Sequence, residues 1–221
     1  LNGSYKYNKT NEYFQAPQAS KILISTIYEG ERINKGFNDV VDFVYWLNEV
    51  KRLNCNLFVY GYKGNIEQEK NKKLKQLVRN RYASIYNRFL EYKPELSSKI
   101  SESICFLFLS RFDPCPNIVI EAMAHGIPIL GLTSGGLPEI VDDAGFLVPV
   151  DELRPSKYYN LRFSGGFEKP SFSKLLEGLL DINSNISSYK MKVRKRINTD
   201  LLIDNIAKHY YKFSSDGHKS D

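Results

Sequence analysis

Short apolar segments alternate with segments of helical periodicity along most of this chain. The apolar segments are of strand length and lie at residues 21–26, 56–60, 105–110, 128–132 and 145–150, with a weaker strand expected at 84–90. Helical spacing is found at residues 37–53, 66–79, 94–103 and 118–125. Because the strands are apolar on both faces, the alternation predicts an α/β fold: a doubly wound parallel sheet with helices on both faces.

The chain has enough apolar sequence for the core of one ordinary domain, with 221 residues of which 42% are hydrophobic. We expect residues 1–20 to form a linker or entry segment, residues 21–213 the domain, and residues 214–221 a disordered tail. The irregular stretch 151–170 is interpreted as a solvated loop, with a binding flap as the alternative. C-terminal helices are expected at 171–181, 186–196 and 201–213.

Charge and cysteine content narrow the functional classes. The net charge of +6 favours a partner with negative charge, such as nucleic acid, an anionic membrane surface or a phosphorylated small molecule. Cys55, Cys105 and Cys115 lack metal-ligand or CxxC spacing, which argues against a disulfide framework or zinc site and favours a reducing, cytoplasmic setting. No segment approaches the roughly 20 apolar residues of a membrane span, so any membrane contact would be peripheral.

The most informative segment is residues 110–150. A strand ends at Ser110, a turn with Pro114 and Pro116 follows, and a helix is expected to begin near Asn117. The helix N-terminus would present backbone N–H groups and the positive end of its dipole at the carboxyl edge of the sheet. This arrangement predicts an anion site.

Two carboxylates mark this segment, Asp113 before the helix and Glu121 within it, with seven residues between them. Glu121 follows an apolar run, where we expect a carboxylate to need a hydrogen-bond donor such as a ribose diol. Taken singly, each feature is unspecific: residues 121–126 are typical of a helix that ends at a glycine, and residues 134–139 of a turn before a helix. A functional site is favoured by the order in which they occur: two carboxylates separated by seven residues, then a strand, then the turn with two glycines.

That order resembles family 4 of the GT-B glycosyltransferases (glycosyl transferases group 1), in the C-terminal donor-binding domain. Residues 34–37, Asn-Lys-Gly-Phe, are similar to the family's Lys-Gly segment, and Asn2 and Gly3 to the Asn-Gly that opens its C-terminal half. The resemblance extends from residue 1 to about residue 180. It implies a Rossmann-like domain that forms one half of a GT-B fold.

The resemblance also implies roles for individual residues. Glu121 would bind the nucleotide ribose, Asp113 would face the sugar hydroxyls, and Lys35 would neutralise the donor diphosphate. The first carboxylate of the family is usually Glu, and Asp113 is one methylene shorter. These three residues are the catalytic candidates.

Further donor contacts follow from the same resemblance. Gly30 occupies the place of the family's phosphate-binding arginine, and the nearby Arg32 is the candidate for that role. The turn backbone would approach the β-phosphate and the sugar at Pro116, Asn117 and Ile118. His125 is expected to be a packed residue near a helix end, not a base.

The implied activity is that of a retaining, hexosyltransferase-like enzyme, which transfers sugar from a nucleoside-diphosphate sugar to an acceptor in polysaccharide or glycan biosynthesis. An N-terminal domain upstream of residue 1 would hold the acceptor. We expect no organic cofactor and no metal, because Asp142 and Asp143 lack the spaced Asp-x-Asp pattern of metal-dependent transferases.

Three alternatives stay open. An epimerase-like nucleotide-sugar enzyme on the same fold would turn over donor without acceptor. A catalytically inactive GT-B module would bind donor without turnover. A nucleic-acid-binding domain is the weakest reading, because the basic residues do not interleave with a known recognition motif, and no nucleic-acid partner is expected.

Overall fold

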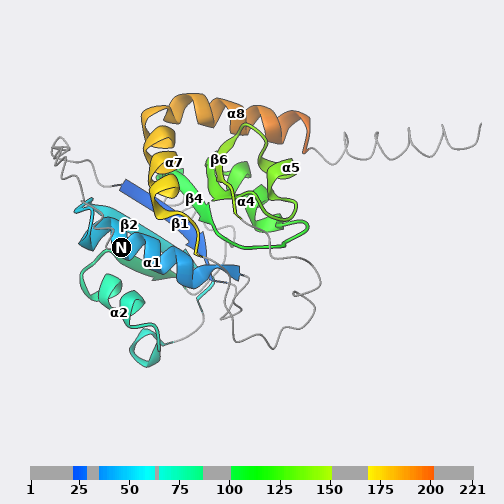
Figure 1. Ribbon diagram of the computed structural model, residues 1–221. Helices are drawn as coiled ribbons and strands as arrows, with labels where there is room; N and C mark the ends of the chain where they lie inside the picture. Colours follow the sequence, from blue (N-terminus) through cyan, green and yellow to red (C-terminus); the bar gives the residue numbers. More distant parts are fainter. Residues whose placement is uncertain (1–21, 29–34, 63–64, 87–100, 151–168, 202–221) are drawn as a thin grey trace, which may run out of the picture.

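The computed structural model describes residues 22–28, 35–62, 65–86, 101–150 and 169–201 (Figure 1). Its centre is a six-stranded sheet with the order β3-β2-β1-β4-β5-β6. Every neighbouring pair of strands is parallel. The strands are β1 (Ile22–Ile27), β2 (Cys55–Tyr60), β3 (Ala83–Tyr86), β4 (Cys105–Phe108), β5 (Ile129–Leu132) and β6 (Gly145–Val148). The predicted doubly wound parallel sheet is confirmed.

The strand order reverses between β1 and β4, at the middle of the sheet. On one side β1 pairs with β2 along its whole length, from Ile22 opposite Cys55 to Ile27 opposite Tyr60. On its other side β1 pairs with β4. The connections that leave β1 and β4 therefore run to helices on opposite faces of the sheet, α1 and α4. Folds of this type bind ligands at the carboxyl edge beside such a reversal.

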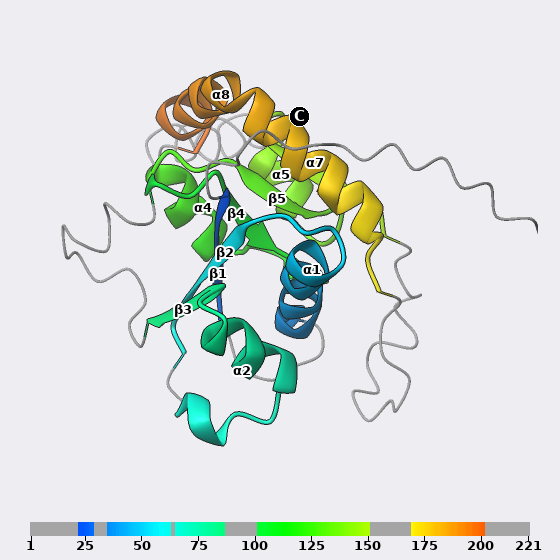
Figure 2. The same cartoon turned by 90° about the vertical axis from the view of Figure 1, so that its left-hand side faces the viewer.

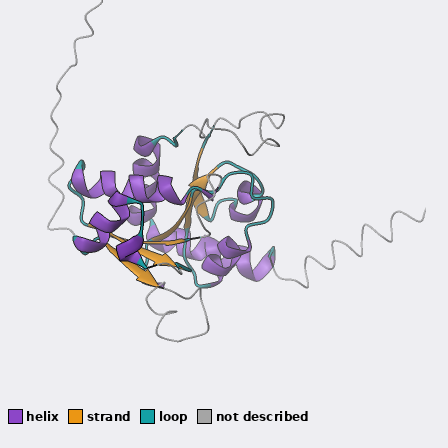
Figure 3. Cartoon of the chain, turned by 90° about the horizontal axis from the view of Figure 1, so that it is seen from below, coloured by secondary structure: helices purple, strands orange, loops and turns teal. Residues whose placement is uncertain are grey.

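Helices cover both faces of the sheet (Figures 1, 2 and 3). One buried cluster unites the sheet with α1, α2 and α7, and a second unites the opposite face with α4, α5 and α8. Successive strand residues alternate between the clusters, as Leu107 belongs to the first and Phe106 and Phe108 to the second. The helices are α1 (Phe37–Glu49), α2 (Lys72–Arg79), α4 (Asn117–Ala124), α5 (Leu137–Val141), α7 (Phe172–Ser184) and α8 (Ile186–Thr199).

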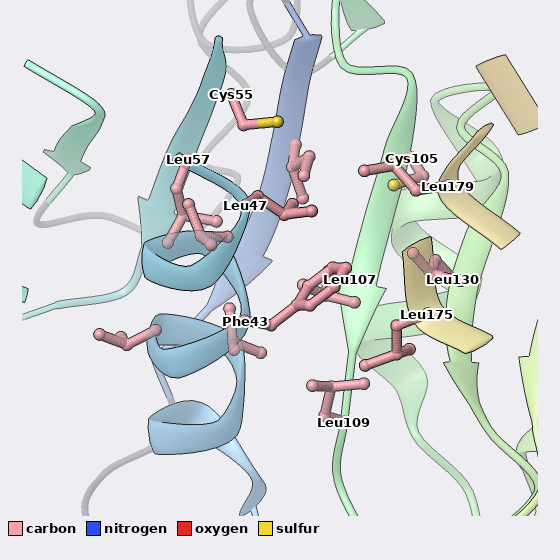
Figure 4. Close-up of a cluster of buried hydrophobic side chains, with 14 of the residues drawn as sticks. Phe43, Leu47, Cys55, Leu57, Cys105, Leu107, Leu109, Leu130, Leu175 and Leu179 are labelled. Carbon is pink, nitrogen blue, oxygen red and sulfur yellow. The ribbon is translucent and has the colours of Figure 1, made fainter. Parts of the chain in front are cut away.

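The first cluster joins α1 to α7 on the same face of the sheet. Phe43 and Leu47 from α1 and Leu175 from α7 point toward the strands, where Leu107 lies between them (Figure 4). The ring of Phe172, at the start of α7, packs against Phe43 with 5.4 Å between ring centroids. Phe43 and Leu47 are four positions apart, which places both on the one buried face of α1. This packing seats α1 on the sheet and so fixes the position of its N-terminus.

The expected helix at 37–53 ends earlier, at Glu49, because the chain turns back toward β2. Arg52 has a φ of 56°, in the left-handed region, and Leu53 donates its N–H to the Leu47 carbonyl. The expected helix at 66–79 is divided into a short 3-10 turn (Ile66–Gln68) and α2. The division occurs because the Asn71 side chain accepts hydrogen bonds from Lys73 N and Leu74 N and so starts α2.

The C-terminal helices expected at 171–181 and 186–196 are confirmed as α7 and α8, each slightly longer than predicted. Residues 134–139 contain the predicted turn and helix start, because α5 begins at Leu137. Several predictions fall outside the described residues: the linker 1–20, the segment 151–168, the last helix at 201–213 beyond residue 201, the tail 214–221 and most of the helix at 94–103.

Within the described part of the chain, none of the helices combines the length and the apolar character that crossing a bilayer requires. Cys55 and Cys105 are buried, Cys115 is exposed, and all three are free thiols. Burial raises the pKa of the Cys55 thiol to about 12, so this side chain stays protonated at neutral pH.

Candidate functional site

Two of the predicted site residues meet where the strand order reverses. Lys35 lies at the end of the β1–α1 connection, and Asp113 lies in the turn between β4 and α4. The Lys35 Nζ and Asp113 Oδ2 atoms are 3.0 Å apart, and both side chains are 19% exposed. An ion pair between residues so distant in sequence places a cation and a carboxylate at one point of the carboxyl edge.

Gly36 makes this approach of the two connections possible. It caps the N-terminus of α1 with a φ of 67°, a conformation that glycine adopts without strain. A Cβ atom at this position would overlap the carbonyl oxygen of Leu109, the residue that follows β4 by one. The backbone beside Lys35 is therefore packed directly against the start of the turn that carries Asp113.

The turn that carries Asp113 is held by hydrogen bonds from both sides. Phe112 has a φ of 57°, in the left-handed region, and its N–H donates to the buried Ser134 Oγ over 2.9 Å. The Asp113 carbonyl accepts from Gly136 N over 2.9 Å, and its Oδ1 accepts from Cys115 N over 3.4 Å. The position of the carboxylate is thus set by the turns after both β4 and β5.

The two glycines of the turn after β5 fit against the backbone of the Asp113 turn. A Cβ atom on Gly135 would overlap the Asp113 backbone, and one on Gly136 would overlap the Pro114 carbonyl oxygen. From the sequence, this Gly-Gly pair is predicted to form a turn before a helix. Its function as a support for Asp113 was not predicted, although two adjacent glycines shortly after a buried strand are a signal of close backbone approach.

Helix α4 begins at Asn117, as predicted, with Pro116 as its N-cap residue. Ile118 is buried in the second cluster, while Asn117 is exposed. The first turn of α4 thus follows Asp113 by only a few residues and points its N-terminus toward the carboxyl edge. The positive end of the helix dipole adds to the charge of Lys35 there.

The structure corrects the expected surroundings of Glu121. The side chain is exposed, not enclosed by the apolar residues that precede it. The buried face of α4 is formed by Ile118, Val119, Ala122 and Met123. In a helix, three consecutive apolar residues spread over a wide arc, and the next position can face solvent. Burial therefore gives no reason for Glu121 to need a partner, and its predicted ribose contact rests on the resemblance alone.

A second ion pair joins the same two connections and was not predicted. The Arg111 Nη1 and Asp39 Oδ2 atoms are 2.9 Å apart, with the Arg111 side chain 5% exposed and Asp39 in the first turn of α1. The available signal was a charged residue shortly after a buried strand. Gly30 and Arg32, the other residues considered for phosphate binding, lie outside the described residues.

The remaining candidates lie elsewhere on the fold. His125 is half-buried at the C-terminal end of α4, away from the Asp113 turn, which agrees with its predicted role as a packed residue. Asp143 pairs with Lys192 of α8 at 3.6 Å. In the described ranges, His, Cys, Asp and Glu form no group of three or more that could hold a metal ion. The site offers a cation, a carboxylate and a helix N-terminus.

Comparison with known proteins agrees with this geometry. The sequence model of the family Glycosyl transferases group 1 matches residues 15–153. The N-acetyl-alpha-D-glucosaminyl L-malate synthase of Bacillus anthracis is 32% identical over 79 residues, which cover 35% of this chain and 21% of that protein. The matched part of the chain thus spans about a fifth of this curated relative.

Solved structures show the same fold. WaaG, a glycosyltransferase involved in lipopolysaccharide biosynthesis, matches with a TM-score of 0.55 and 17% identity over 82% of this chain and 44% of its own. The catalytic domain of cholesterol-alpha-glucosyltransferase from Helicobacter pylori matches with a TM-score of 0.53 and 16% identity, over 81% of this chain and 96% of its own. The catalytic domain of starch synthase IV from Arabidopsis thaliana, bound to ADP and acarbose, matches with a TM-score of 0.56 and 17% identity, over 89% of this chain and 38% of its own.

Proposed function

Because this chain belongs to the glycosyl transferases group 1 family, we propose that it forms the donor-binding domain of a retaining glycosyltransferase. The enzyme would transfer a hexose from a nucleoside-diphosphate sugar to an acceptor during polysaccharide or glycan biosynthesis. The observation that carries the proposal is the ion pair of Lys35 with Asp113 where the strand order reverses. A cation held at that edge suits a diphosphate. The ADP in the starch synthase IV structure is consistent with such a donor.

Lys35 is suited to stabilise the charge of the leaving diphosphate. An ammonium group has three donors, so Lys35 can keep its contact with Asp113 and also donate to a phosphate oxygen. The N-terminus of α4 adds backbone N–H groups at Asn117 and Ile118, beside Pro116. Charge that develops on the diphosphate as the glycosidic bond breaks would then meet groups already in place. Arg32 is proposed as a second phosphate contact.

The two carboxylates take different parts in the proposal. Asp113 is fixed by its backbone and half-buried, so its oxygens can accept hydrogen bonds from sugar hydroxyls at a defined position. Glu121 is exposed one helical turn further along α4, where it is free to accept from a ribose diol. The acceptor would be held by another domain, upstream of residue 1. No metal or organic cofactor takes part in this proposal.

The proposal is tested by calorimetry with UDP, GDP and ADP, with and without a chelator. We expect one of the three to bind equally well in both conditions, because Lys35 and the helix N-terminus supply the positive charge. Lys35→Ala should weaken that binding by about 1.5–3 kcal/mol, the usual value of a hydrogen bond to a charged group. Binding that requires magnesium or manganese, or an unchanged affinity of the variant, would overturn the site as proposed.

Turnover distinguishes the alternatives from the transferase. The complete protein should transfer sugar to an acceptor or hydrolyse donor slowly without one, whereas residues 1–221 alone should do neither, because proximity of donor and acceptor supplies roughly 7–11 kcal/mol of catalysis. Acceptor-independent conversion of the donor sugar by the complete protein would indicate an epimerase-like enzyme. Binding without any turnover would indicate an inactive module.

A further inference from the structure

The ion pair of Arg111 with Asp39 has no part in the proposed chemistry, although it lies beside the site. We propose that these two are positioning residues, which fix the β1–α1 and β4–α4 connections in the register at which Lys35 meets Asp113. The inference rests on the proposed function of that pair, because it assigns Arg111 and Asp39 an effect on diphosphate binding that is exerted through Lys35.

Burial makes the Arg111 contact a strong constraint. The Arg111 side chain is 5% exposed, and Asp39 Oδ2 lies 2.9 Å from its Nη1 atom. A guanidinium removed from water in this way is costly unless polar or charged partners compensate it, and Asp39 is such a partner. Separating the two side chains is therefore costly while the domain is folded. The carboxylate of Asp39 is also favoured by its place in the first turn of α1, near the positive end of the helix dipole.

The two ion pairs connect the same two segments with opposite polarity. Lys35 and Asp39 lie on one segment, one helical turn apart, while Arg111 and Asp113 lie two residues apart on the other. In the observed register each cation meets a carboxylate. A slipped register would bring Lys35 toward Arg111, or Asp39 toward Asp113, and like charges at short range repel. The second ion pair therefore selects the register that the first one needs.

Helix α1 also provides a matched control, Asp42. Its side chain is 17% exposed, against 18% for Asp39, and it accepts from Lys73 and Lys169 over 2.7 and 2.6 Å. Those lysines belong to α2 and to the segment before α7, not to the Asp113 turn. Both aspartates are thus ion-paired and similarly buried on one helix, but only Asp39 connects to the turn of the site.

The test compares Asp39→Asn with Asp42→Asn in the complete protein. We would measure the dissociation constant for whichever of UDP, GDP and ADP binds the wild type, and for its nucleoside, together with the melting temperature. Asp39→Asn should weaken diphosphate binding by about tenfold or more, because displacement of a binding group by about 1 Å is costly, and should leave nucleoside binding unchanged. Asp42→Asn should lower the melting temperature without changing either affinity.

A double-mutant cycle separates positioning from general destabilisation. If Asp39 acts through Lys35, then Asp39→Asn introduced into the Lys35→Ala protein should cause no further loss of diphosphate affinity. Equal losses in both backgrounds would overturn the inference, as would equal affinities of Asp39→Asn and Asp42→Asn. If Asp39→Asn does not fold, as judged by circular dichroism, Arg111→Gln undergoes the same comparisons with the same expected and contradicting results. A wild type that binds none of the three nucleotides would instead refute the proposed function.

Discussion

The interior of the sheet and its carboxyl edge are held together by different interactions. In the interior, Leu47, Leu107 and Leu175 are fully buried and touch other apolar side chains (Figure 4). At the edge, the contacts are ion pairs and backbone hydrogen bonds, such as those of Asp113. Apolar burial is strong but non-directional, whereas polar contacts are weaker and fix position. We therefore expect changes in the interior to lower stability and changes at the edge to alter binding.

Glycines show the same difference. Gly178, in α7, is packed against the side chain of Phe146, where a Cβ atom would meet the aromatic ring. Gly136, at the edge, is packed against the Pro114 carbonyl oxygen. A ring can rotate or shift to make room, but a backbone carbonyl can move only if the turn moves with it. Small residues at the edge thus serve the geometry of the site, and those in the interior serve packing.

The largest expected effect tests the interior. Leu107→Ala removes a fully buried side chain between α1 and α7 and should destabilise the domain by about 2–5 kcal/mol, because part of the cavity will not collapse. Urea unfolding measures this loss. Nucleotide affinity at a temperature where the variant is folded should equal that of the wild type. A parallel loss of affinity would show that interior and edge are not separable.

The next effect tests the edge. Gly136→Ala should cost about 1–3 kcal/mol of stability, as overpacking usually does, and should also weaken nucleoside-diphosphate binding, because the Asp113 turn must move. Gly178→Ala is the matched substitution in the interior and should leave binding unchanged. Calorimetry and urea unfolding of both variants give the comparison. Unchanged binding by Gly136→Ala would mean that the turn after β5 does not set the position of Asp113.

The interior was predictable from sequence to a greater extent than the edge. Buried parallel strands are near-continuous apolar runs, so each of the six strands was expected within a few residues of its observed bounds. Lys35 and Asp113 were also expected at the edge, through the resemblance. Their ion pair was not, because sequence spacing carries no information on a contact between residues 78 positions apart.

The error at Glu121 has a similar origin. An apolar run before a carboxylate indicates burial in a strand, whereas in a helix the direction of each side chain depends on the exact rotation about the axis. Arg111 was missed for the opposite reason: a lone arginine in a turn is expected to be solvated, whereas in the folded domain its side chain is 5% exposed and paired with Asp39 of α1. Local sequence patterns therefore do not predict contacts between polar groups that only the tertiary fold brings together.

A smaller effect tests the proposed contact of Glu121 with the ribose. Glu121→Ala should weaken nucleoside-diphosphate binding if the carboxylate accepts from the ribose. We expect a loss of about 0.5–1.5 kcal/mol, less than for a buried charged group, because the exposed carboxylate is well hydrated in the free domain. Because Glu121 is exposed, the free energy of unfolding should not change. The 2′,3′-dideoxynucleotide is the control, and the variant should bind it as well as the wild type does. A stability loss without a binding loss would make Glu121 a structural residue.

The smallest effect is a pH dependence of stability at Asp42, away from the edge. Burial alone would raise the pKa of Asp42, but hydrogen bonds from Lys169 and Lys73 outweigh it and lower the pKa below its ordinary value. A lowered folded-state pKa contributes stability above the unfolded value, near 3.9, and that contribution is lost as pH falls through the lowered pKa. Because the two lysines are 46% and 65% exposed, solvent screening limits the contribution to about 0.2–1 kcal/mol. Urea unfolding of wild type and Asp42→Asn should therefore differ at pH 7, and the difference should shrink as the pH falls through the lowered pKa of Asp42, with equal nucleotide affinities at pH 7. A difference that does not change with pH would assign the effect to packing, and a change of affinity would extend the edge to the second turn of α1.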